Sequence, residues 1–250
     1  MTFAAIGSGA VFRLREEWLA GREGFAGVVG KDRLADSLND IDVLFIGVPP
    51  GERLAVASEA ARCGVHVFLE WPPAVSVGEC GEIIRLAEEA GLEAGVSRPL
   101  RFHETLRKIG WRADLSALRL AGSPGNLYQE LADLVDLACA LAGTTSVLRV
   151  DAEIVREQGI AAFGLRYHSG AYSQAVIQPA SSRKTLSVIA AAAADFLDVE
   201  IDVDDEMGDA VAEETLQFLS AISDERPVPV SALDALHTMR VVERLMGNLR

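Results

Sequence analysis

The stretch from Gly64 to Pro73 constrains the fold of this chain more than any other. Five residues with strand preference, His66 to Glu70, run directly into Trp71 and a pair of prolines. Because proline cannot donate a hydrogen bond to a strand ladder, the strand must end there. Ser76 and Glu79 have the spacing of a capping box and open a helix. We therefore predict a parallel strand that ends in a turn facing a cleft, where α/β folds place their ligands.

A second strand-turn-helix unit begins the chain. A strand over residues 2–6 leads through Gly7 and Gly9 into a helix that reaches about Gly21. The first glycine permits a tight turn, and the second lets a pyrophosphate approach backbone N–H groups. Phe12 occupies the third position of this fingerprint, where Gly or Ala is usual. We expect Phe12 either to widen the helix–strand packing or to crowd the pyrophosphate; a turn that binds no phosphate is the alternative.

These strand ends resemble those of the Gfo/Idh/MocA oxidoreductases. Glu70-Trp71-Pro72 matches the Glu-Lys-Pro of that family, and Pro49-Pro50 follows a buried strand over residues 43–48 as in its Thr-Pro-Pro. The resemblance covers nearly the whole chain in order. It implies an α/β plus α+β protein with a Rossmann-like parallel-sheet domain over residues 1–104. An open-faced, mainly antiparallel domain would follow over residues 105–250, with the last helix packing back on it.

Two positions that carry the chemistry of the family are changed. The lysine is replaced by Trp71, whose indole N–H can donate a hydrogen bond but supplies no charge and no transferable proton near neutral pH. The helix predicted over residues 127–142 resembles the one with the catalytic histidine. Asp133 stands at the histidine position, and only Asp136 of the acidic set is retained.

The resemblance therefore implies an oxidoreductase homologue with a degenerate catalytic site, a pseudoenzyme rather than an ordinary sugar dehydrogenase. The alternative is an active NAD(P)H-dependent reductase of a non-sugar substrate. The biliverdin reductase branch is similar in this respect, since it also has an aromatic residue at the lysine position. The predicted catalytic positions are Glu70, Trp71, Asp133 and Asp136.

The implied cofactor is NAD(P), unless binding has been lost. The acidic residue that would hold the adenosine ribose is absent at Gly30, and Asp32 is the nearest substitute. Lys31 and Arg33 would suit a 2′-phosphate, which favours NADP over NAD, although both could simply lie in a solvated loop. The predicted cofactor-binding residues are Gly7, Gly9, Ala10, Val11, Lys31, Arg33, Val48, Pro49 and Glu70.

Two further arginines lie near predicted strand ends. Arg53, close to a helix N-terminus, either meets a phosphate or lies at the surface, and we favour the surface. Arg101 lies in a segment that resembles the link between the two domains of the family. It either contacts substrate or cofactor or forms a salt bridge across the domain junction.

Composition narrows the class of partner. A formal charge of -14 over 250 residues argues against binding to nucleic acid or to an anionic membrane. No apolar run approaches about 18 residues and no leader precedes the first strand, which favours a cytoplasmic protein. Cys63, Cys80 and Cys139 lack metal-ligand spacing, so we expect inert thiols and no metal. The family buries the outer face of its second sheet against another subunit, which implies a homodimer, and a small molecule is the kind of ligand that its fold allows.

Overall fold

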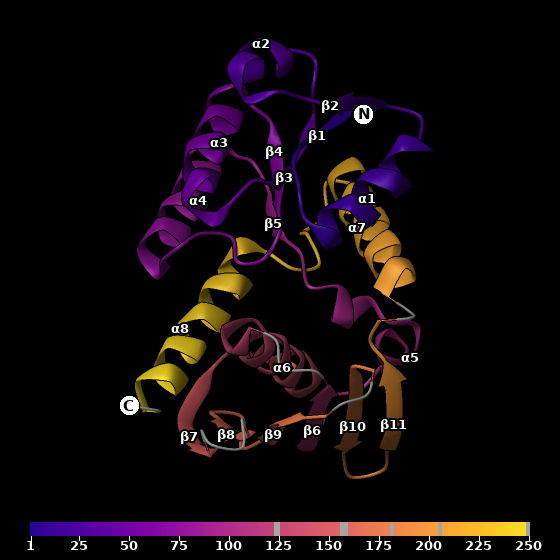
Figure 1. Ribbon diagram of the computed structural model, residues 1–250, viewed down its shortest axis with the longest axis vertical. Coiled ribbons are helices and arrows are strands. Elements are labelled where there is room, and N and C mark those ends of the chain that lie inside the picture. Colours follow the sequence, from indigo (N-terminus) through magenta and orange to yellow (C-terminus); the bar gives the residue numbers. More distant parts are fainter. Residues whose placement is uncertain (123–125, 156–159, 181–182, 205–206, 249–250) are drawn as a thin grey trace. The chain divides into compact units, whose positions relative to one another are not determined.

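The computed structural model describes residues 1–122, 126–155, 160–180, 183–204 and 207–248 (Figure 1). The chain divides into two compact units, one of residues 1–99 with 211–236 and the other of residues 100–210 with 237–250. The sequence predicts one boundary, at residue 104; in the structure the first unit also includes residues 211–236. The turn predicted at residues 122–126 lies partly outside the described residues.

The first unit is built on a five-stranded parallel sheet with the order β2-β1-β3-β4-β5. Its strands are β1 (Phe3–Gly7), β2 (Phe25–Val28), β3 (Val43–Gly47), β4 (His66–Leu69) and β5 (Ala94–Val96). The central strand β3 is buried along its whole length, as expected for a parallel strand covered on both faces. The order of the strands reverses between β1 and β3, so their carboxyl ends form the switch point where α/β sheets bind ligands.

Helices cover both faces of this sheet. The helices α3 (Pro50–Arg62) and α4 (Val77–Ala90) lie on one face, while α1 (Ala10–Ala20) and α7 (Met207–Ser223), which belongs to this unit from residue 211 onward, lie on the other (Figure 1). Phe218 of α7 packs edge-on against Phe45 and Phe68 of the sheet. The crossover between β2 and β3 is short, as predicted, and contains only η1 (Lys31–Arg33) and α2 (Leu34–Ser37).

The second unit holds a six-stranded sheet with the order β11-β10-β6-β9-β8-β7. Its strands are β6 (Leu115–Gly122), β7 (Val147–Val155), β8 (Ile160–Tyr167), β9 (Tyr172–Pro179), β10 (Thr185–Ala191) and β11 (Phe196–Asp202). The predicted antiparallel character holds for every pair except one. Strand β6 is inserted between β9 and β10 and runs parallel to β9, because the helix α6 (Leu127–Ala142) and two strands separate them in the chain.

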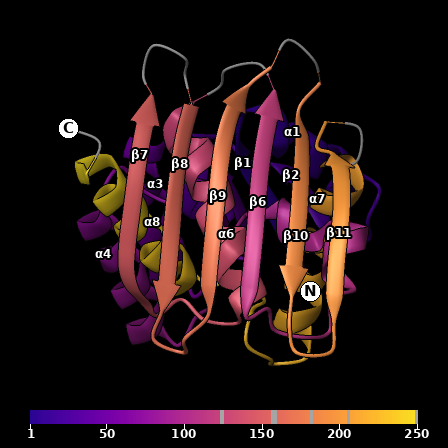
Figure 2. The ribbon, with the colours of Figure 1, turned by 90° about the horizontal axis from the view of Figure 1, so that it is seen from below.

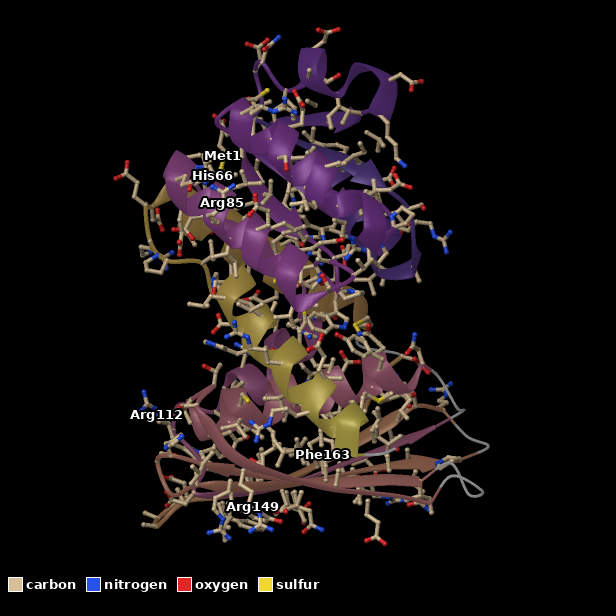
Figure 3. The ribbon with its side chains drawn as sticks, turned by 90° about the vertical axis from the view of Figure 1, so that its left-hand side faces the viewer. Met1, His66, Arg85, Arg112, Arg149 and Phe163 are labelled. Carbon is tan, nitrogen blue, oxygen red and sulfur yellow. The ribbon has the colours of Figure 1, made fainter. Side chains whose placement is uncertain are left out.

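One face of this second sheet is covered by α6, and no other helix or strand among the described residues of this unit lies over the opposite face (Figure 2). Along the strands, side chains that face α6 are buried and side chains that face away from it are more exposed. Phe163 is buried on the helix side, whereas Arg149 projects from the opposite face (Figure 3). The side chain of Asn126 caps the start of α6 by accepting hydrogen bonds from the backbone N–H groups of Tyr128 and Gln129. Gly143 ends the helix in the left-handed conformation.

Three short or terminal elements complete the chain: η2 (Pro99–Phe102), α5 (Glu104–Arg107) and α8 (Ala232–Asn248). Within the first unit, the Val96 N–H donates to the carbonyl of Val230, so the segment before α8 pairs with the edge of β5. Of the helices in the described part of the chain, none has the length and apolar character needed to cross a lipid bilayer.

Candidate dinucleotide site and predicted catalytic positions

The glycine turn at the end of β1 has the geometry of a phosphate cradle. Gly7 has a φ of 136°, and a Cβ there would overlap the backbone of Gly47 on the neighbouring strand. Gly9 has a φ of 126° and opens onto space that holds no atom within 4 Å of the place of a Cβ. The first turn of α1 carries no acidic residue and no side-chain cap. Its backbone N–H groups, from Ala10 onward, are therefore directed at an exposed position suited to an anion.

Phe12 does not crowd this turn. Its ring is buried and lies against the Cα of Gly47, where any larger residue on β3 would overlap it. The missing glycine of the fingerprint on α1 is therefore compensated by a glycine on the adjacent strand. The expectation that Phe12 crowds the pyrophosphate is therefore wrong. The ring lies in the packing between α1 and β3, and the approach to Gly9 remains open.

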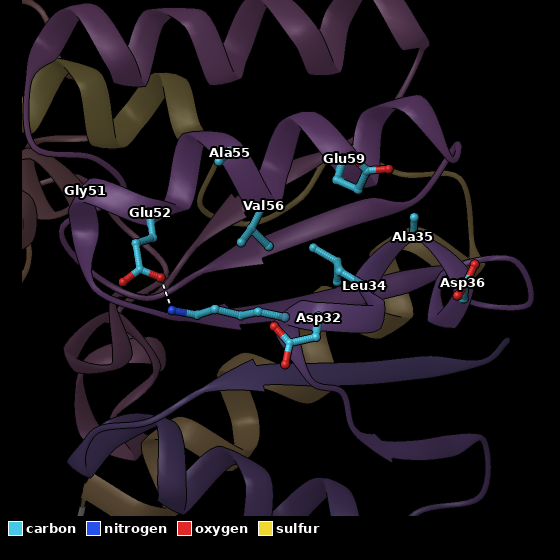
Figure 4. Close-up of a pocket in the computed structure, with 10 residues that line it drawn as sticks. Asp32, Leu34, Ala35, Asp36, Gly51, Glu52, Ala55, Val56 and Glu59 are labelled. Atoms are coloured by element: carbon cyan, nitrogen blue, oxygen red, sulfur yellow. Dashed lines mark hydrogen bonds and ion pairs between the residues drawn. The ribbon is translucent and has the colours of Figure 1, made fainter.

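A hollow of about 520 Å³ lies beside the η1–α2 crossover and the start of α3 (Figure 4). Lys31 and Glu52 form an ion pair across its edge, which Figure 4 marks with a dashed line. Three more carboxylates line it, those of Asp32, Asp36 and Glu59. Among the described side chains that line the hollow, one ammonium group therefore stands against four carboxylates. The side chain of Arg33 lies outside the part that the structure describes.

Arg53 is not at the surface, so our preference for a surface position is wrong. Its side chain is buried and its Nε donates to the carbonyl of Val48 at 2.8 Å. It also donates to the carbonyls of Glu70 and Pro72. Burial lowers the pKa of Arg53 to about 10 even though Glu70 acts in the opposite direction. Arg53 thus links the segments that follow β3 and β4, in which Pro49 and Glu70 lie.

Glu70 enters a buried ionic cluster that the sequence analysis missed. Arg15 of α1, 1% exposed, donates from Nε to Oε1 of Glu70 at 2.9 Å and from Nη2 to Oε2 of Glu214 at 2.8 Å. The same guanidinium donates to the hydroxyls of Ser97 and Thr215. It also lies over the ring of Phe68, 4.4 Å from the centroid. The cluster, which we name the Arg15 cluster, consists of Arg15, Glu70, Ser97, Glu214 and Thr215.

Electrostatics keep Arg15 charged in this buried position. Burial alone lowers the pKa of Arg15, but Glu70 and Glu214 outweigh it and the net shift is upward. Burial raises the pKa of Glu214. Arg15 and the backbone N–H of Arg98 act in the opposite direction, but their combined effect is smaller, so the net shift of this pKa is upward. Glu214 is thus a buried carboxylate that shares its guanidinium with another carboxylate, which makes its ionised form harder to maintain. In this arrangement the carboxylate of Glu70 is directed at helix α1.

Trp71, at the lysine position, stacks with a cation. The guanidinium of Arg98 lies 3.2 Å from the centroid of its ring, within the range of a cation–π interaction. The backbone N–H of Arg98 donates to Glu214, which connects this stack to the Arg15 cluster. The Trp71–Pro72 peptide bond is cis.

The two aspartates of α6 differ in their surroundings. Asp136 is 2% exposed and receives a forked ion pair from Arg101, with both N···O distances at 2.7 Å. Asp133 is half-buried and accepts a hydrogen bond from Gln129, one turn earlier, at 2.9 Å. Arg101 therefore forms a salt bridge, one of its two expected roles, but its partner lies in the same unit instead of across a junction.

The structure brings some predicted residues together and leaves others apart. Gly7, Gly9, Ala10, Val48 and Pro49 meet at the carboxyl ends of β1 and β3, where the Ser8 N–H donates to the carbonyl of Gly47. Lys31 lies at the hollow. Among the described residues, no group of three or more His, Cys, Asp or Glu side chains has an arrangement that could hold a metal ion.

The cradle fits a dinucleotide by three tests: Gly7 allows close backbone approach, Gly9 faces open space, and the start of α1 offers uncapped N–H groups. Residues 15–97 match the model of a family described as an oxidoreductase family with an NAD-binding Rossmann fold. Over these residues the chain matches the Gfo/Idh/MocA family. The predicted resemblance is confirmed, and the first sheet is that of an NAD-binding oxidoreductase family.

Solved structures share the fold of the chain at low identity. A probable dehydrogenase from Thermotoga maritima is 15% identical with a TM-score of 0.83, and the match covers 100% of this chain and 97% of that one. UDP-N-acetylglucosamine 3-dehydrogenase GnnA from Acidithiobacillus ferrooxidans is 18% identical with a TM-score of 0.82 over the same shares. Scyllo-inositol dehydrogenase from Lactobacillus casei, solved with NAD(H) and scyllo-inositol, is 15% identical, with a TM-score of 0.82 and 100% and 96% covered.

These matches confirm the predicted fold class, a Rossmann-like parallel sheet followed by a mainly antiparallel one. No protein of curated function matches the chain by sequence.

Proposed function

We propose that this chain binds a nicotinamide dinucleotide at the turn of Gly7 and Gly9 and is not an ordinary sugar dehydrogenase. The observation that carries the proposal is the contrast between two parts of the first unit. The phosphate cradle is open and uncapped, whereas the Glu70 carboxylate is directed away into the Arg15 cluster. Trp71 supplies no proton near neutral pH.

The roles of the chain's own residues follow from their positions. The N–H groups at the start of α1 would hold the pyrophosphate, with the positive end of the helix dipole behind them. Val48 and Pro49, at the end of β3, would form the adjacent wall. A bound nicotinamide would supply hydride transfer. Asp136 would contribute to stability through Arg101 rather than move a proton, and Asp133 would be a poor substitute for a histidine base at neutral pH.

The proposed cofactor is NAD rather than the NADP that Lys31 and Arg33 favoured in the sequence. Lys31 is paired with Glu52, and four carboxylates line the hollow where an adenosine ribose would lie. An uncharged ribose hydroxyl can donate hydrogen bonds to such carboxylates, whereas a 2′-phosphate would be repelled.

The test is a titration of NADH followed by its fluorescence, with Ala10→Asp and Ala10→Ser compared with the wild type. Ala10 is exposed at the first position of α1, where an aspartate favours the helix but places a negative charge at the cradle. We expect Ala10→Asp to weaken NADH binding by at least about tenfold without a loss of thermal stability. Ala10→Ser should bind like the wild type. Failure of the wild type to bind either dinucleotide at millimolar concentration would contradict the proposal.

A second candidate, an active reductase of a non-sugar substrate, is supported by one observation. The guanidinium of Arg98 on the ring of Trp71 places a cation beside the position of the missing lysine. Oxidation of NADH by a carbonyl substrate, abolished by Trp71→Ala while NADH still binds, would favour this candidate over a pseudoenzyme.

We also propose a homodimer formed through the outer face of the second sheet. Leu115, Ile189 and Phe196 are 57, 41 and 69% exposed on that face. Burial of such side chains against a second copy would remove apolar surface from water. The cytoplasmic location stays a prediction.

A further inference from the structure

The hollow beside η1 and α3 contains an ion pair that bears directly on cofactor choice. Among the described side chains that line the hollow, Lys31 carries the positive charge, and its ammonium group forms an ion pair with Glu52 (Figure 4). Both side chains are about half exposed, so the pair is hydrated. The charge of Lys31 is already balanced by Glu52, so a 2′-phosphate gains less from this lysine than from a free one.

The position of Glu52 favours its ionised form. Glu52 lies in the first turn of α3, whose start carries Pro49 as cap and no side-chain capping bond. The positive end of the helix dipole stabilises a carboxylate there. Asp32 and Asp36 add two negative charges on the crossover side of the hollow. A 2′-phosphate would therefore compete with Glu52 for Lys31 in a field that is already negative.

We propose that Glu52 determines specificity for NAD over NADP, by neutralising Lys31 and repelling a 2′-phosphate. The inference rests on the proposed function, because it requires the dinucleotide to bind with its adenosine ribose at this hollow. The choice of cofactor would then depend on a residue of α3 as well as on the loop after β2. In the sequence, Lys31 and Arg33 of that loop favoured NADP.

The experiment measures dissociation constants of NADH and NADPH by fluorescence titration for the wild type, Glu52→Gln, Lys31→Met and the double variant. Glutamine keeps the size and helix preference of glutamate, so α3 should be retained. We expect the wild type to bind NADH more tightly than NADPH. Glu52→Gln should tighten NADPH by about tenfold and change NADH by less than about twofold, since only NADPH carries the extra phosphate. This gain should disappear when Lys31→Met is added.

Glu59→Gln is the matched control. Glu59 lines the same hollow two turns further along the same face of α3 but pairs with Arg62 rather than with Lys31. Its removal should leave the ratio of the two dissociation constants within about twofold of the wild type, because its charge is already balanced.

The outcomes separate this inference from the proposed function. Wild-type preference for NADPH, an equal response of both nucleotides to Glu52→Gln, or a gain that persists without Lys31 would each overturn the role of Glu52 while leaving dinucleotide binding in place. Absence of binding of both nucleotides to the wild type and to every variant would overturn the proposed function and this inference with it.

Discussion

Arg15 occupies a core position that hydrophobic burial alone does not explain. It lies on the same face of α1 as the buried Phe12 and Leu19, and Glu214 lies on the buried face of α7. Removing one partner from a buried ionic group leaves an uncompensated charge and costs about 3–5 kcal/mol. The cluster therefore favours one way of packing α1 and α7 against the sheet, which keeps the start of α1 in place beside β3.

Glu214 should give the protein a pH dependence of known sign. Burial raises its pKa above the ordinary value of 4.5, so the native state holds the proton more tightly than the unfolded chain does. The stability from this group is complete below pH 4.5 and is lost as the pH rises through the native pKa. The free energy of unfolding of the wild type minus that of Glu214→Gln should thus fall above pH 4.5, by at most about 1.4 kcal/mol per pH unit.

Urea titrations at several pH values, followed by tryptophan fluorescence, measure this difference. Glu213→Gln removes a carboxylate from the same helix but not from the Arg15 cluster, so it should keep the pH dependence of the wild type. A difference between wild type and Glu214→Gln that grows with pH would contradict the assignment.

Phe12 and Gly47 should behave as a coupled pair. A methyl group at Gly47 would overlap the ring of Phe12, so Gly47→Ala should lower the free energy of unfolding by about 1–3 kcal/mol. In a Phe12→Leu background the same change should cost less than half as much, because the smaller side chain leaves room for it. Urea denaturation of the four proteins of this double-mutant cycle measures the coupling. An equal penalty in both backgrounds would show that the ring does not set the requirement for glycine.

At the scale of elements, the acidic residues of α6 contribute to packing or helix structure. The forked pair between Asp136 and Arg101 is buried at the carboxylate, and the Gln129–Asp133 bond is a pair one turn apart on a helix surface. The first arrangement is expensive to break, and the second contributes little. The same helix therefore carries one aspartate that is needed for folding and one that is replaceable.

Asp136→Asn should destabilise the protein by about 3 kcal/mol because it breaks a forked ion pair whose carboxylate is buried. Asp133→Asn, on the same helix, should cost less than about 1 kcal/mol. Thermal and urea unfolding followed by circular dichroism compare the two variants. Equal effects, or a larger effect at Asp133, would contradict the structural role of Asp136.

Element positions were predictable because they depend on local patterns. The helix 127–142 begins at an Asn cap and ends at a left-handed Gly143, and both signals are legible in sequence. The Arg15 cluster was not predictable as a set, since its members are up to 200 residues apart. A partial signal existed, because Arg15 interrupts the apolar face that Phe12 and Leu19 define. Arg53 was misassigned because the carbonyls that bind it belong to strand ends whose pairing only the fold defines.

At the scale of the whole molecule, the proposed assembly depends on the outer face of the second sheet, over which the described residues of that unit place no helix or strand (Figure 2). Leu115 and Phe196 share a row across β6, β10 and β11, since both are in register with Ala191. Ile189 lies one row away on the same face. An apolar patch of this kind is typical of an interface between subunits.

The combined substitution Ile189→Glu and Phe196→Glu should convert a dimer into a monomer, because burial of two added carboxylates at an interface is unfavourable. Val75→Glu, at an equally exposed apolar residue of the first unit, should leave the dimer intact. Sedimentation velocity reports the masses directly. A wild type that sediments as a monomer at micromolar concentration would contradict the proposed interface.

The central claim is that this chain has kept a dinucleotide cradle while its proton-transfer positions have been replaced or engaged in ion pairs. Calorimetric titration of the wild type with NADH tests the first half of that claim most directly, with Ala10→Asp as the comparison. The account predicts saturable binding at one site per chain, lost or weakened at least about tenfold in Ala10→Asp. No saturable binding by the wild type, or equal binding by both proteins, would contradict it.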